Sequence, residues 1–412
     1  MFSNLKKIFY FPIAYYFGFF AQIQLLLWKP KIIIITGSNG KTTLLHLIES
    51  QLGKKAKYSH HANSAFGIPF NILGLERKNL TIGEWPMLFL LAPFKAFKLS
   101  PKEKIYVVEA DCDRPFEGKF LGQLLKPKIT IWLSVSKTHT VNFPPPVEEN
   151  VAFEFGNFLE YTKNFCIING DAKLILNQLP RTKTEIKKVT KNHLQNYQVS
   201  KRGTNFKIDN KTFTINYLLP EDTFYLLATL IELLKKLDIP LDLKFTNFIL
   251  PPGRSTILEG IKKTTIIDSS YNATPASVTA ILRMFKKYPG NKWAIIGDMI
   301  ELGTEEQEEH EKLAREIAKG DLAKVILVGP RVTKYTYPKL KTLVNIPIET
   351  FINPKEALDY LKDNIGGEEV LLFKGARFLE GIIEHLLKNK VDVNKLCRRE
   401  KVWQERRKKW GL

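Results

Sequence analysis

The stretch that most constrains this chain is TGSNGKTT, residues 36 to 43, because of the residues on either side of it. Ile32 to Ile35 form a short apolar run that is typical of a buried parallel strand. From Thr42 onward the apolar residues have helical spacing. A glycine-bearing turn between a strand and a helix directs backbone N–H groups and the positive helix end toward one point. The sequence therefore predicts a binding site for a nucleotide phosphate.

The residues of this turn have different expected roles. Lys41 would reach the terminal phosphates, and the Thr42 hydroxyl would supply an oxygen ligand to Mg²⁺. A standard phosphate loop has a glycine where this chain has Ile35, so the pattern leaves open an ordinary turn with a surface lysine. The residues expected to bind ATP here are Gly37, Ser38, Asn39, Gly40, Lys41, Thr42 and Thr43.

Composition narrows the setting of this site. The chain has 412 residues, enough for two or three domains with cores of their own. Its three cysteines, Cys112, Cys166 and Cys397, have no paired spacing, which argues against disulfides and zinc and indicates a reducing, cytoplasmic compartment. The formal net charge of +20 suggests polyanionic partners: nucleic acid, an acidic membrane surface or phosphorylated substrates. Charge alone does not choose among these.

The two ends of the chain could contact a membrane. Residues 8–28 carry no charge and could just span a bilayer, although Pro12, Gln22 and Gln24 weaken that interpretation. A helix packed on the first domain and a helix lying on the inner face of the membrane are the two preferred alternatives. A second apolar patch starts at Met87, and a basic tail with Trp403 follows near the C-terminus. That tail is either a solvated terminal helix or an interfacial anchor.

Between the ends, strand and helix patterns alternate, as in KIYVVEAD, KITIWLSVS and FCIING followed by a helical stretch from Asp222. The alternation restarts after LPPGRS, whose prolines and glycine predict a boundary near residue 252. We expect an α/β fold: a central phosphate-loop domain with a mostly parallel sheet, then a smaller Rossmann-like α/β domain. The predicted segments are an apolar helix at 1–30, a central domain at 31–251, a second domain at 252–390 and a basic tail at 391–412.

Two further side chains follow predicted strands. In α/β sheets ligands gather at the carboxyl ends of strands, and VVEAD places Glu109 at such an end, where a carboxylate can hold Mg²⁺. His139 follows another strand in the same way. A lone histidine is more often structural than a ligand, but its expected position across from Glu109 and Thr42 favours a metal role.

Eight motifs together resemble the Mur ligase family, in the order that the family has them. The most specific pair is YNATP followed by GDMIELG, and the resemblance covers roughly residues 31 to 390, with the closest likeness to the branch that adds D-alanyl-D-alanine to the peptidoglycan tripeptide. The phosphate loop of that family also departs from the standard glycine spacing, so Ile35 is no objection. The motifs are TGSNGKTT, NSAFGIPFNIL, VVEAD, SVSKTH, PPGRS, IIDSSYNATPAS, IIGDMIELG and LLFKGAR.

The resemblance implies a role for each matching residue. In the predicted central domain, Lys41, Glu109 and His139 would be catalytic, with Thr42, Glu109 and His139 as the metal ligands. Arg254 would reach the nucleotide from the hinge, and Asp268 would contact its ribose or phosphate side. Other matching positions would line the nucleotide cleft (Tyr271 and Asn272), bind substrate (Asn63 and Ser64) or lie near the incoming amine (Lys374 and Arg377).

The resemblance also implies a reaction. A carboxylate attacks the γ-phosphate of ATP, and an amine then displaces phosphate from the acyl phosphate to form an amide. The expected partners are a small-molecule amine, which is an amino acid or dipeptide, and a peptide or glycopeptide acceptor such as a muropeptide used in cell-wall synthesis. Nucleic acid is not expected, since the basic residues are not interleaved with an aromatic platform.

Three departures from the family pattern set apart this chain. Only about thirty residues precede the phosphate strand, which leaves no room for the family's UDP-binding domain, so we expect an acceptor held by a partner or presented on a lipid. Phe155 stands at the position of the usual carbamylated lysine, where Glu154 could supply a carboxylate or be a solvated helix residue. Tyr225 replaces an asparagine near adenine and could stack on the base.

These departures keep alternatives open. One is a relative that acts on a lipid-linked or non-wall acceptor by amidation or polyglutamate-type extension. The other is a membrane-attached ATP-binding protein without ligase activity, which Phe155 permits.

Overall fold

The structure is a computed structural model that describes residues 9–77, 82–136 and 142–412. The chain divides into two compact units. The first comprises residues up to His193 together with Tyr225–Phe248, and the second comprises Leu194–Phe224 and Ile249–Leu412. The boundaries at residues 30, 251 and 390 stay predictions.

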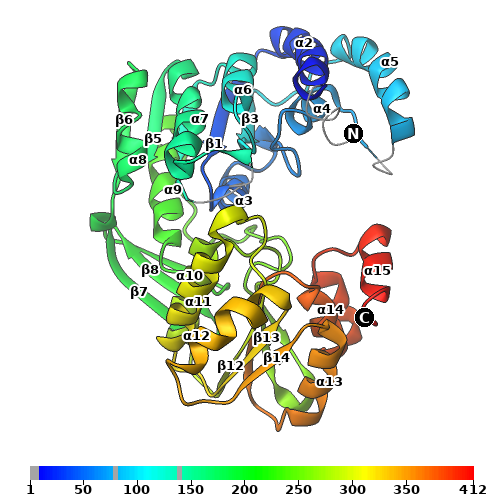
Figure 1. The fold of residues 1–412 in the computed structure, drawn as a ribbon. Helices are drawn as coiled ribbons and strands as arrows, with labels where there is room; N and C mark the ends of the chain where they lie inside the picture. Colours follow the sequence, from blue (N-terminus) through cyan, green and yellow to red (C-terminus); the bar gives the residue numbers. More distant parts are fainter. Residues whose placement is uncertain (1–8, 78–81, 137–141) are drawn as a thin grey trace. The chain divides into compact units, whose positions relative to one another are not determined.

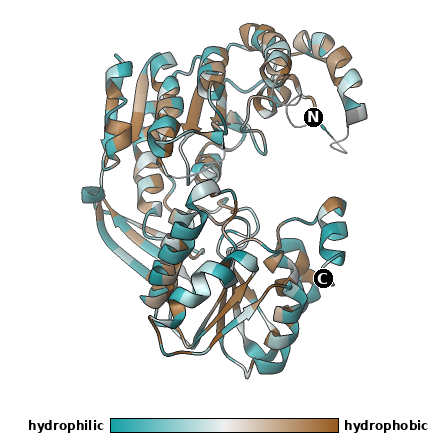
Figure 2. Ribbon diagram, in the orientation of Figure 1, coloured by the Kyte–Doolittle hydropathy of each residue, from teal (hydrophilic) through white to brown (hydrophobic). Residues whose placement is uncertain are grey.

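The first unit is built on a parallel sheet of six strands in the order β2-β3-β1-β4-β5-β6 (Figure 1). The central strand β1 carries four consecutive isoleucines, and the side chains of all four are buried. Figure 2 shows the same hydrophobic character in the neighbouring strands. The strands are β1 (Lys31–Thr36), β2 (Ala56–Tyr58), β3 (Ile105–Glu109), β4 (Ile129–Trp132), β5 (Phe165–Asn169) and β6 (Glu185–Val189).

Helices connect these strands and pack on the sheet. Apolar side chains of α2 (Tyr10–Trp28) and of most of these helices pack with alternate strand residues into one large core that includes Phe17, Tyr106 and Phe158. The helices are α3 (Lys41–Leu52), α4 (Gly67–Leu73), α5 (Trp85–Ala96), α6 (Glu117–Leu125), α7 (Val147–Tyr161), α8 (Lys173–Leu176) and α9 (Thr223–Leu237), whose first two residues belong to the second unit.

The apolar N-terminal segment forms helix α2 (Tyr10–Trp28), which is long and apolar enough to cross a membrane by length and composition alone. One face of α2 packs into the core of the first unit through Ala14, Phe17, Ala21 and Trp28. The Trp28 indole also donates a hydrogen bond to a backbone carbonyl of the unit at 2.6 Å. The helix is therefore part of the first unit's core.

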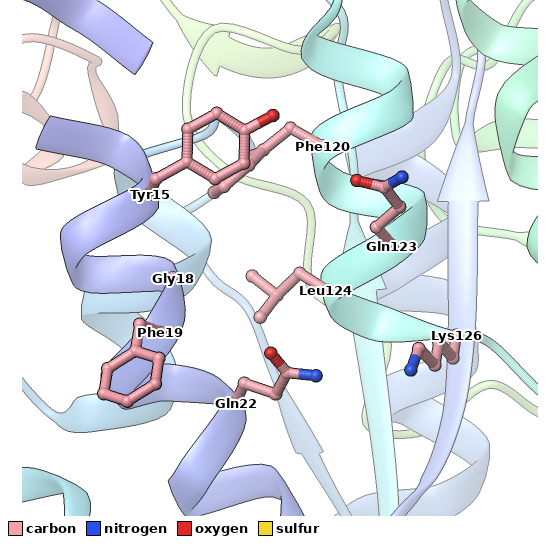
Figure 3. A pocket seen from close by; sticks show the side chains of 8 residues that line it. All are labelled: Tyr15, Gly18, Phe19, Gln22, Phe120, Gln123, Leu124 and Lys126. Atoms are coloured by element: carbon pink, nitrogen blue, oxygen red, sulfur yellow. The ribbon is translucent and has the colours of Figure 1, made fainter. Parts of the chain in front are cut away.

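On its outer side, α2 borders a groove over α6 (Figure 3). Tyr15 and Phe19 from α2 line the groove together with Phe120 and Leu124 from α6. Tyr15 and Phe19 are exposed. The groove is therefore mainly apolar, with amide and amino groups at its margin.

The second unit contains a six-stranded sheet in the order β10-β11-β15-β12-β13-β14, parallel except for the antiparallel pair β10 and β11. A separate antiparallel sheet follows the order β7-β8-β9. The strands are β7 (Leu194–Ser200), β8 (Gly203–Ile208), β9 (Lys211–Ile215), β10 (Thr256–Glu259), β11 (Thr265–Asp268), β12 (Lys292–Gly297), β13 (Lys324–Val328), β14 (Ile348–Phe351) and β15 (Val370–Lys374).

Helices cover both faces of the larger sheet, since two separate apolar clusters flank it. The first helix begins with a capping box, in which Thr274 and Ser277 each accept a hydrogen bond from the other's backbone N–H. The helices are α10 (Pro275–Lys287), α11 (Glu306–Ala318), α12 (Tyr337–Lys341), α13 (Pro354–Asn364), α14 (Leu379–Leu386) and α15 (Lys401–Lys408). The α/β fold class predicted from the sequence, with a parallel sheet in the first unit, is confirmed.

The basic tail folds back onto the second unit. Arg398 and Arg407 both lie near the buried Glu380 of α14, at 3.3 Å and 3.6 Å between guanidinium and carboxylate. Arg407 is itself buried, and Arg399 pairs with Glu384 at 2.6 Å. Several arginines of the tail therefore form ion pairs with carboxylates of α14.

Candidate active site

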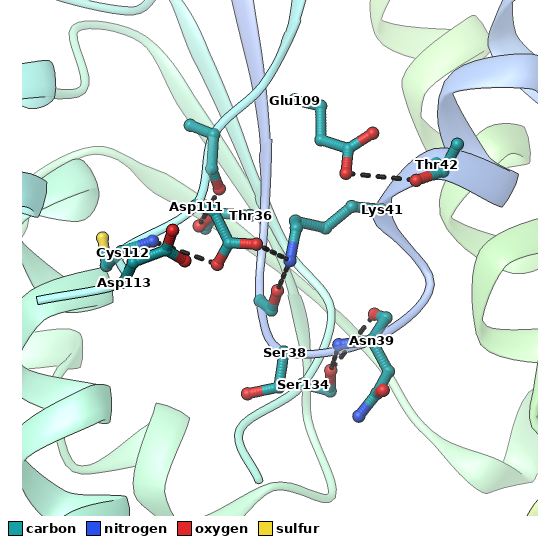
Figure 4. A network of polar contacts seen from close by, with 12 residues as sticks. Thr36, Ser38, Asn39, Lys41, Thr42, Glu109, Asp111, Cys112, Asp113 and Ser134 are labelled. Atoms are coloured by element: carbon teal, nitrogen blue, oxygen red, sulfur yellow. Dashed lines mark hydrogen bonds and ion pairs between the residues drawn. The ribbon is translucent and has the colours of Figure 1, made fainter. Parts of the chain in front are cut away.

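The predicted phosphate turn lies at the carboxyl ends of three neighbouring strands. β1 pairs with β3 on one side and β4 on the other, with Ile35 opposite Glu109 and Thr36 opposite Trp132. The residues that follow these strand ends therefore meet around the turn (Figure 4). This is the edge of a parallel sheet at which ligands bind in α/β proteins.

The turn needs two of its glycines for backbone conformation and space. Gly37 has a φ of +124° and Gly40 a φ of +88°, values that other residues rarely adopt. A Cβ at Gly37 would also come within 2.8 Å of the Ser134 backbone. Both glycines are therefore required by the local geometry.

Hydrogen bonds to the loop after β4 hold the middle of the turn. The Asn39 N–H donates to the Ser134 hydroxyl at 2.9 Å, and the Ser136 N–H donates to the Ser38 hydroxyl at 2.9 Å. The Asn39 side chain donates to the Ser136 hydroxyl at 3.0 Å. The side chains of Ser38 and Asn39 thus shape the turn itself.

Lys41, the first residue of α3, is buried, and its ammonium group lies 2.8 Å from an Asp111 carboxylate oxygen. It also donates to the Gly37 carbonyl. Burial by itself would lower the pKa of Lys41, but the Asp111 and Glu109 carboxylates outweigh it and raise the pKa. Lys41 therefore stays charged inside the turn.

Thr42 and Glu109 come together as the sequence predicts. The Thr42 hydroxyl donates to a Glu109 carboxylate oxygen at 3.1 Å, and the Glu109 N–H donates to the Ser59 hydroxyl at 2.8 Å. A hydroxyl and a carboxylate are the oxygen ligands that Mg²⁺ prefers. Thr43 follows in the first turn of α3, whereas His139 lies outside the described residues.

Asn63 and Ser64 lie close to this cluster. The Asn63 carbonyl accepts from the Asp111 N–H at 2.8 Å, and the Ser64 hydroxyl accepts from the Gly67 N–H at 3.2 Å. Asn63 is therefore brought next to the partner of Lys41. Ser64 holds the start of α4.

Glu154 has a structural role that neither sequence-based interpretation foresaw. It is buried, and its two carboxylate oxygens accept from the N–H groups of Phe116 and Gly118 at 2.8 Å and 3.1 Å. These contacts satisfy free donors at the start of α6. The expectation of a solvated helix residue is therefore wrong, and Glu154 is engaged away from a metal role. Its neighbour Phe155 is buried in the core near Trp132.

Tyr225 has a polar contact within the first unit. Its hydroxyl donates to Asp171 at 2.6 Å. Asp171 also accepts from the Lys191 N–H at 2.6 Å. Stacking of Tyr225 on a base stays a prediction.

In the second unit, Asp268 at the carboxyl end of β11 is buried. One carboxylate oxygen accepts from the Ser270 N–H and hydroxyl at 3.0 Å and 2.6 Å. The other oxygen has no hydrogen-bond partner among the residues that the structure describes. Burial raises the pKa of Asp268 to about 6, which the Ser270 hydrogen bonds partly oppose.

Lys374 ends the neighbouring strand β15 and is also buried. Its ammonium group donates to the Asn272 carbonyl at 2.6 Å. Burial, followed by the charge of Arg254, lowers the pKa of Lys374 to about 7, although Asp268 opposes this shift. The Arg254 guanidinium lies over the Tyr271 ring at 4.6 Å. Five of the predicted residues thus gather at one edge of this sheet.

Arg377 is held by a buried carboxylate that the sequence reasoning did not single out. Its guanidinium donates to Asp298 at 2.7 Å, and Asp298 also accepts from the N–H groups of Arg331 and Val332 at 3.0 Å. Asp298 lies in the motif GDMIELG, and Asp111 lies in VVEAD. Both aspartates follow strands, which is the signal that could have identified them.

Two protein-family models match consecutive parts of the chain. "Mur ligase middle domain" matches residues 35–223, and "Mur ligase, glutamate ligase domain" matches residues 253–377. Together they cover most of the chain and include every predicted site residue.

Individual relatives agree with this match. The UDP-N-acetylmuramoyl-tripeptide--D-alanyl-D-alanine ligase of Rickettsia prowazekii is 27% identical over 85% of this chain and 76% of the relative. The ligase of the same name from Bacillus subtilis is 24% identical over 87% of this chain and 76% of the relative. A crystal structure of MurF ligase from Thermotoga maritima in complex with ADP has a TM-score of 0.71 at 20% identity, covering 95% of this chain and 84% of that chain.

Proposed function

Because the chain belongs to the Mur ligase family, we propose that it is an ATP-dependent ligase that joins a carboxylate to an amine. The observation that carries the proposal is the cluster of Lys41, Asp111, Thr42 and Glu109 around a glycine turn at the carboxyl ends of β1 and β3. Such a cluster offers a cation, backbone donors and oxygen ligands at one place. These are the groups that phosphoryl transfer from a nucleotide requires.

The proposed reaction has two steps. A carboxylate oxygen of the acceptor attacks the γ-phosphorus of ATP, the bond from that phosphorus to the bridging oxygen breaks, and ADP leaves. The amine nitrogen then attacks the acyl carbon, inorganic phosphate leaves, and the nitrogen loses a proton. An amide bond results. Lys41 would hold the terminal phosphate of ATP and offset charge on the transferring group.

The residues present fit ATP and Mg²⁺. In the first unit, the positive φ values at Gly37 and Gly40 let the loop backbone approach a phosphate closely. In the second unit by itself, the unpartnered oxygen of Asp268 can accept a hydrogen bond from a hydroxyl group. Thr42 and Glu109 would hold Mg²⁺, with His139 as a third proposed ligand. When bound, Mg²⁺ neutralises part of the phosphate charge.

The proposed acceptor is a muropeptide-like peptide or glycopeptide, and the proposed amine is an amino acid or dipeptide. The names of the relatives, which are ligases for UDP-N-acetylmuramoyl-tripeptide and D-alanyl-D-alanine, support this choice. Asn63 and Ser64 would contact the acceptor, and Lys374 and Arg377 would lie near the amine. We propose a cytoplasmic location, because ATP is available there.

The test is the mass of the product formed from ATP, Mg²⁺ and a pool of wall precursors. Lys41→Ala should abolish the product, whereas Lys54→Ala, which changes an exposed lysine after the same helix, should retain it. Thr42→Val leaves the Lys41 and Asp111 pair in place and should also abolish the product. Product formed at an undiminished rate by Lys41→Ala and Thr42→Val would disprove the proposed phosphate site.

One observation favours a second candidate, an ATP-binding protein without ligase activity. In the family, a carbamylated lysine supplies a carboxylate to the metal. Here Phe155 is buried in the core, and the Glu154 carboxylate accepts hydrogen bonds from backbone N–H groups at the start of α6, so neither residue replaces that ligand. ATP turnover that is independent of every added amine and acceptor would favour this candidate.

We also propose that the first unit rests on the inner face of the membrane through α5. Met87, Leu90, Phe94 and Phe97 follow one another at helical spacing, and all four are exposed, with Leu90 at 70% and Phe94 at 77%. The nearby Leu99 is almost fully exposed. An uncovered apolar stripe of this kind is typical of a surface that binds lipid or protein.

Charge near the stripe supports lipid as the occupant. Lys95 lies within α5, and Lys98 and Lys102 follow it in the chain. Lysines beside an apolar stripe attract anionic headgroups while the apolar side chains enter the acyl boundary. The same surface would suit a lipid-linked acceptor.

Sedimentation with vesicles tests the membrane proposal. The protein should sediment with vesicles that contain anionic lipid and remain in solution with neutral vesicles. The double variant Leu90→Glu, Phe94→Glu should lose this binding, whereas Ile249→Glu, at an exposed residue of the second unit, should retain it. Equal binding by the double variant would overturn the assignment to α5.

A further inference from the structure

Three side chains with metal-binding atoms gather beside the phosphate turn without belonging to it. His46 and Glu49 lie one turn apart on α3, and His60 follows β2. Their ligand atoms all lie within 4.8 Å of one another. From this geometry we infer that His46, Glu49 and His60 bind a zinc-type divalent metal ion.

The distances within the cluster suit one shared ion. A Glu49 carboxylate oxygen lies 3.0 Å from Nε2 of His60 and 3.5 Å from Nδ1 of His46. In a tetrahedral site with metal–ligand distances of about 2.0–2.2 Å, ligand atoms lie roughly 3.4 Å apart. Two of the three separations are therefore already close to what a tetrahedral ion needs.

The donor set selects the class of metal. Two imidazole nitrogens and one carboxylate oxygen are ligands that zinc and similar transition ions accept, whereas Mg²⁺ and Ca²⁺ prefer oxygen alone. Three protein ligands leave a coordination position for water. The side chains of His46, Glu49 and His60 are 19%, 37% and 34% exposed, so an ion can reach them from solvent.

The histidine pair itself is consistent with such a site. The rings of His46 and His60 lie with their centroids 5.0 Å apart and 38° between their planes. One carboxylate serves both rings, since Glu49 contacts each of them. A divalent ion between the three groups would satisfy both nitrogens at once.

A metal here would tie together elements that carry the phosphate site. His46 is one turn beyond Thr42 on α3, and the hydroxyl of Ser59, beside His60, accepts a hydrogen bond from the Glu109 N–H at 2.8 Å. The ion would thus link α3 to the residues after β2. We expect it to stabilise this part of the first unit whether or not the chain is an active ligase.

Calorimetric titration of the full chain with zinc, in the presence of excess Mg²⁺, tests the inference. We expect one zinc ion per chain and an unfolding temperature that rises with zinc concentration. Cobalt should bind at the same place and give the visible absorption of a site with nitrogen ligands.

Variants identify the ligands. His60→Ala and His46→Ala should each weaken zinc binding by about 100-fold or more, because two ligands remain of three. His61→Ala is the matched control: it removes the exposed neighbouring histidine, which lies outside the cluster, and should leave binding unchanged. Glu49→Gln should weaken binding and keep the side-chain shape.

The inference is wrong if the unmodified protein binds no zinc under these conditions. It is also wrong if His60→Ala, His46→Ala and Glu49→Gln, each shown to be folded by circular dichroism, bind zinc as tightly as the unmodified protein.

Discussion

Lys41 in the first unit and Lys374 in the second are both buried lysines near the carboxyl end of a parallel strand, yet their pKa values shift in opposite directions. The pKa of Lys41 is raised, whereas the pKa of Lys374 is lowered to about 7. Burial favours the neutral form of both. The difference must therefore come from their neighbours.

Lys41 has a carboxylate at 2.8 Å in Asp111, with Glu109 as a second negative charge. Lys374 donates to a neutral carbonyl, that of Asn272, and has the positive charge of Arg254 nearby, opposed only by Asp268. The partner, and not the depth of burial, decides the charge of each lysine. The first unit therefore keeps a permanent cation at its phosphate turn, whereas the second holds a lysine that can gain or lose its proton near neutral pH.

Removing Asp111 should have the largest effect, because it should make Lys41 resemble Lys374. In Asp111→Ala, Lys41 stays buried without its nearest counter-charge, so its pKa should fall and the protein should lose about 3–5 kcal/mol of stability. Urea unfolding at neutral pH measures the loss. The double variant Asp111→Ala, Lys41→Met should recover part of it, because no unpaired charge remains. A loss well under 1 kcal/mol in the single variant would show that the pair is not needed.

Lys374→Met should change how stability depends on pH. The pKa of Lys374 is about 7 when folded, against 10.5 for an ordinary lysine. Between these values the unfolded chain holds a proton that the folded chain has released, so stability rises with pH; below pH 7 the full penalty remains. The difference between these pKa values corresponds to about 5 kcal/mol, and losing the hydrogen bond to the Asn272 carbonyl should offset about 1–2 kcal/mol of it. The variant should therefore lack this rise and be more stable at pH 6 by about 3 kcal/mol. Unfolding at several pH values measures both. Identical pH profiles for the variant and the unmodified protein would show that burial does not disfavour the charged form of Lys374.

Asp268→Asn tests a dependence of stability on pH that is opposite to that of Lys374 and comes from the same unit. The pKa of Asp268 is raised from 3.8 to about 6. Between these values the folded state retains a proton that the unfolded chain has lost, so the stability contributed by this group falls as pH rises. The variant should lack that fall and gain about 3 kcal/mol above pH 6 relative to the unmodified protein. Asp209→Asn, at an exposed residue of the same unit, should leave the profile unchanged. A fall that persists in Asp268→Asn must come from another group.

The parts of the site that the sequence predicts correctly are local. The strand at Ile32 to Ile35, the glycine turn and α3 follow from a contiguous pattern, so their order fixes where Lys41 and Thr42 lie. Glu109 could be placed beside Thr42 because parallel strands end at the same edge of the sheet. These inferences need no knowledge of side-chain packing.

The remaining contacts join residues that are far apart in the sequence. Glu154 holds the start of α6 across 38 and 36 residues, and its motif gives no sign of this partner. Asp111 pairs with Lys41 across 70 residues, so its role depends on which strands become neighbours. Tertiary packing decides such contacts, and local patterns do not reveal them.

Gln24 in α2 extends the comparison to a buried polar group without charge. It is fully buried, and neither polar atom of its amide has a partner among the residues that the structure describes. Burying an amide without hydrogen bonds costs stability, but less than burying a charge. Gln24→Leu should therefore stabilise the protein by about 1 kcal/mol, seen as a higher urea midpoint with an unchanged slope. Gln22→Leu, at the margin of the groove beside α6, should have little effect. If Gln24→Leu destabilises the protein, the Gln24 amide must have hydrogen-bond partners in solution. The partner of the buried group, and not its burial, would then again decide whether the group stabilises the protein.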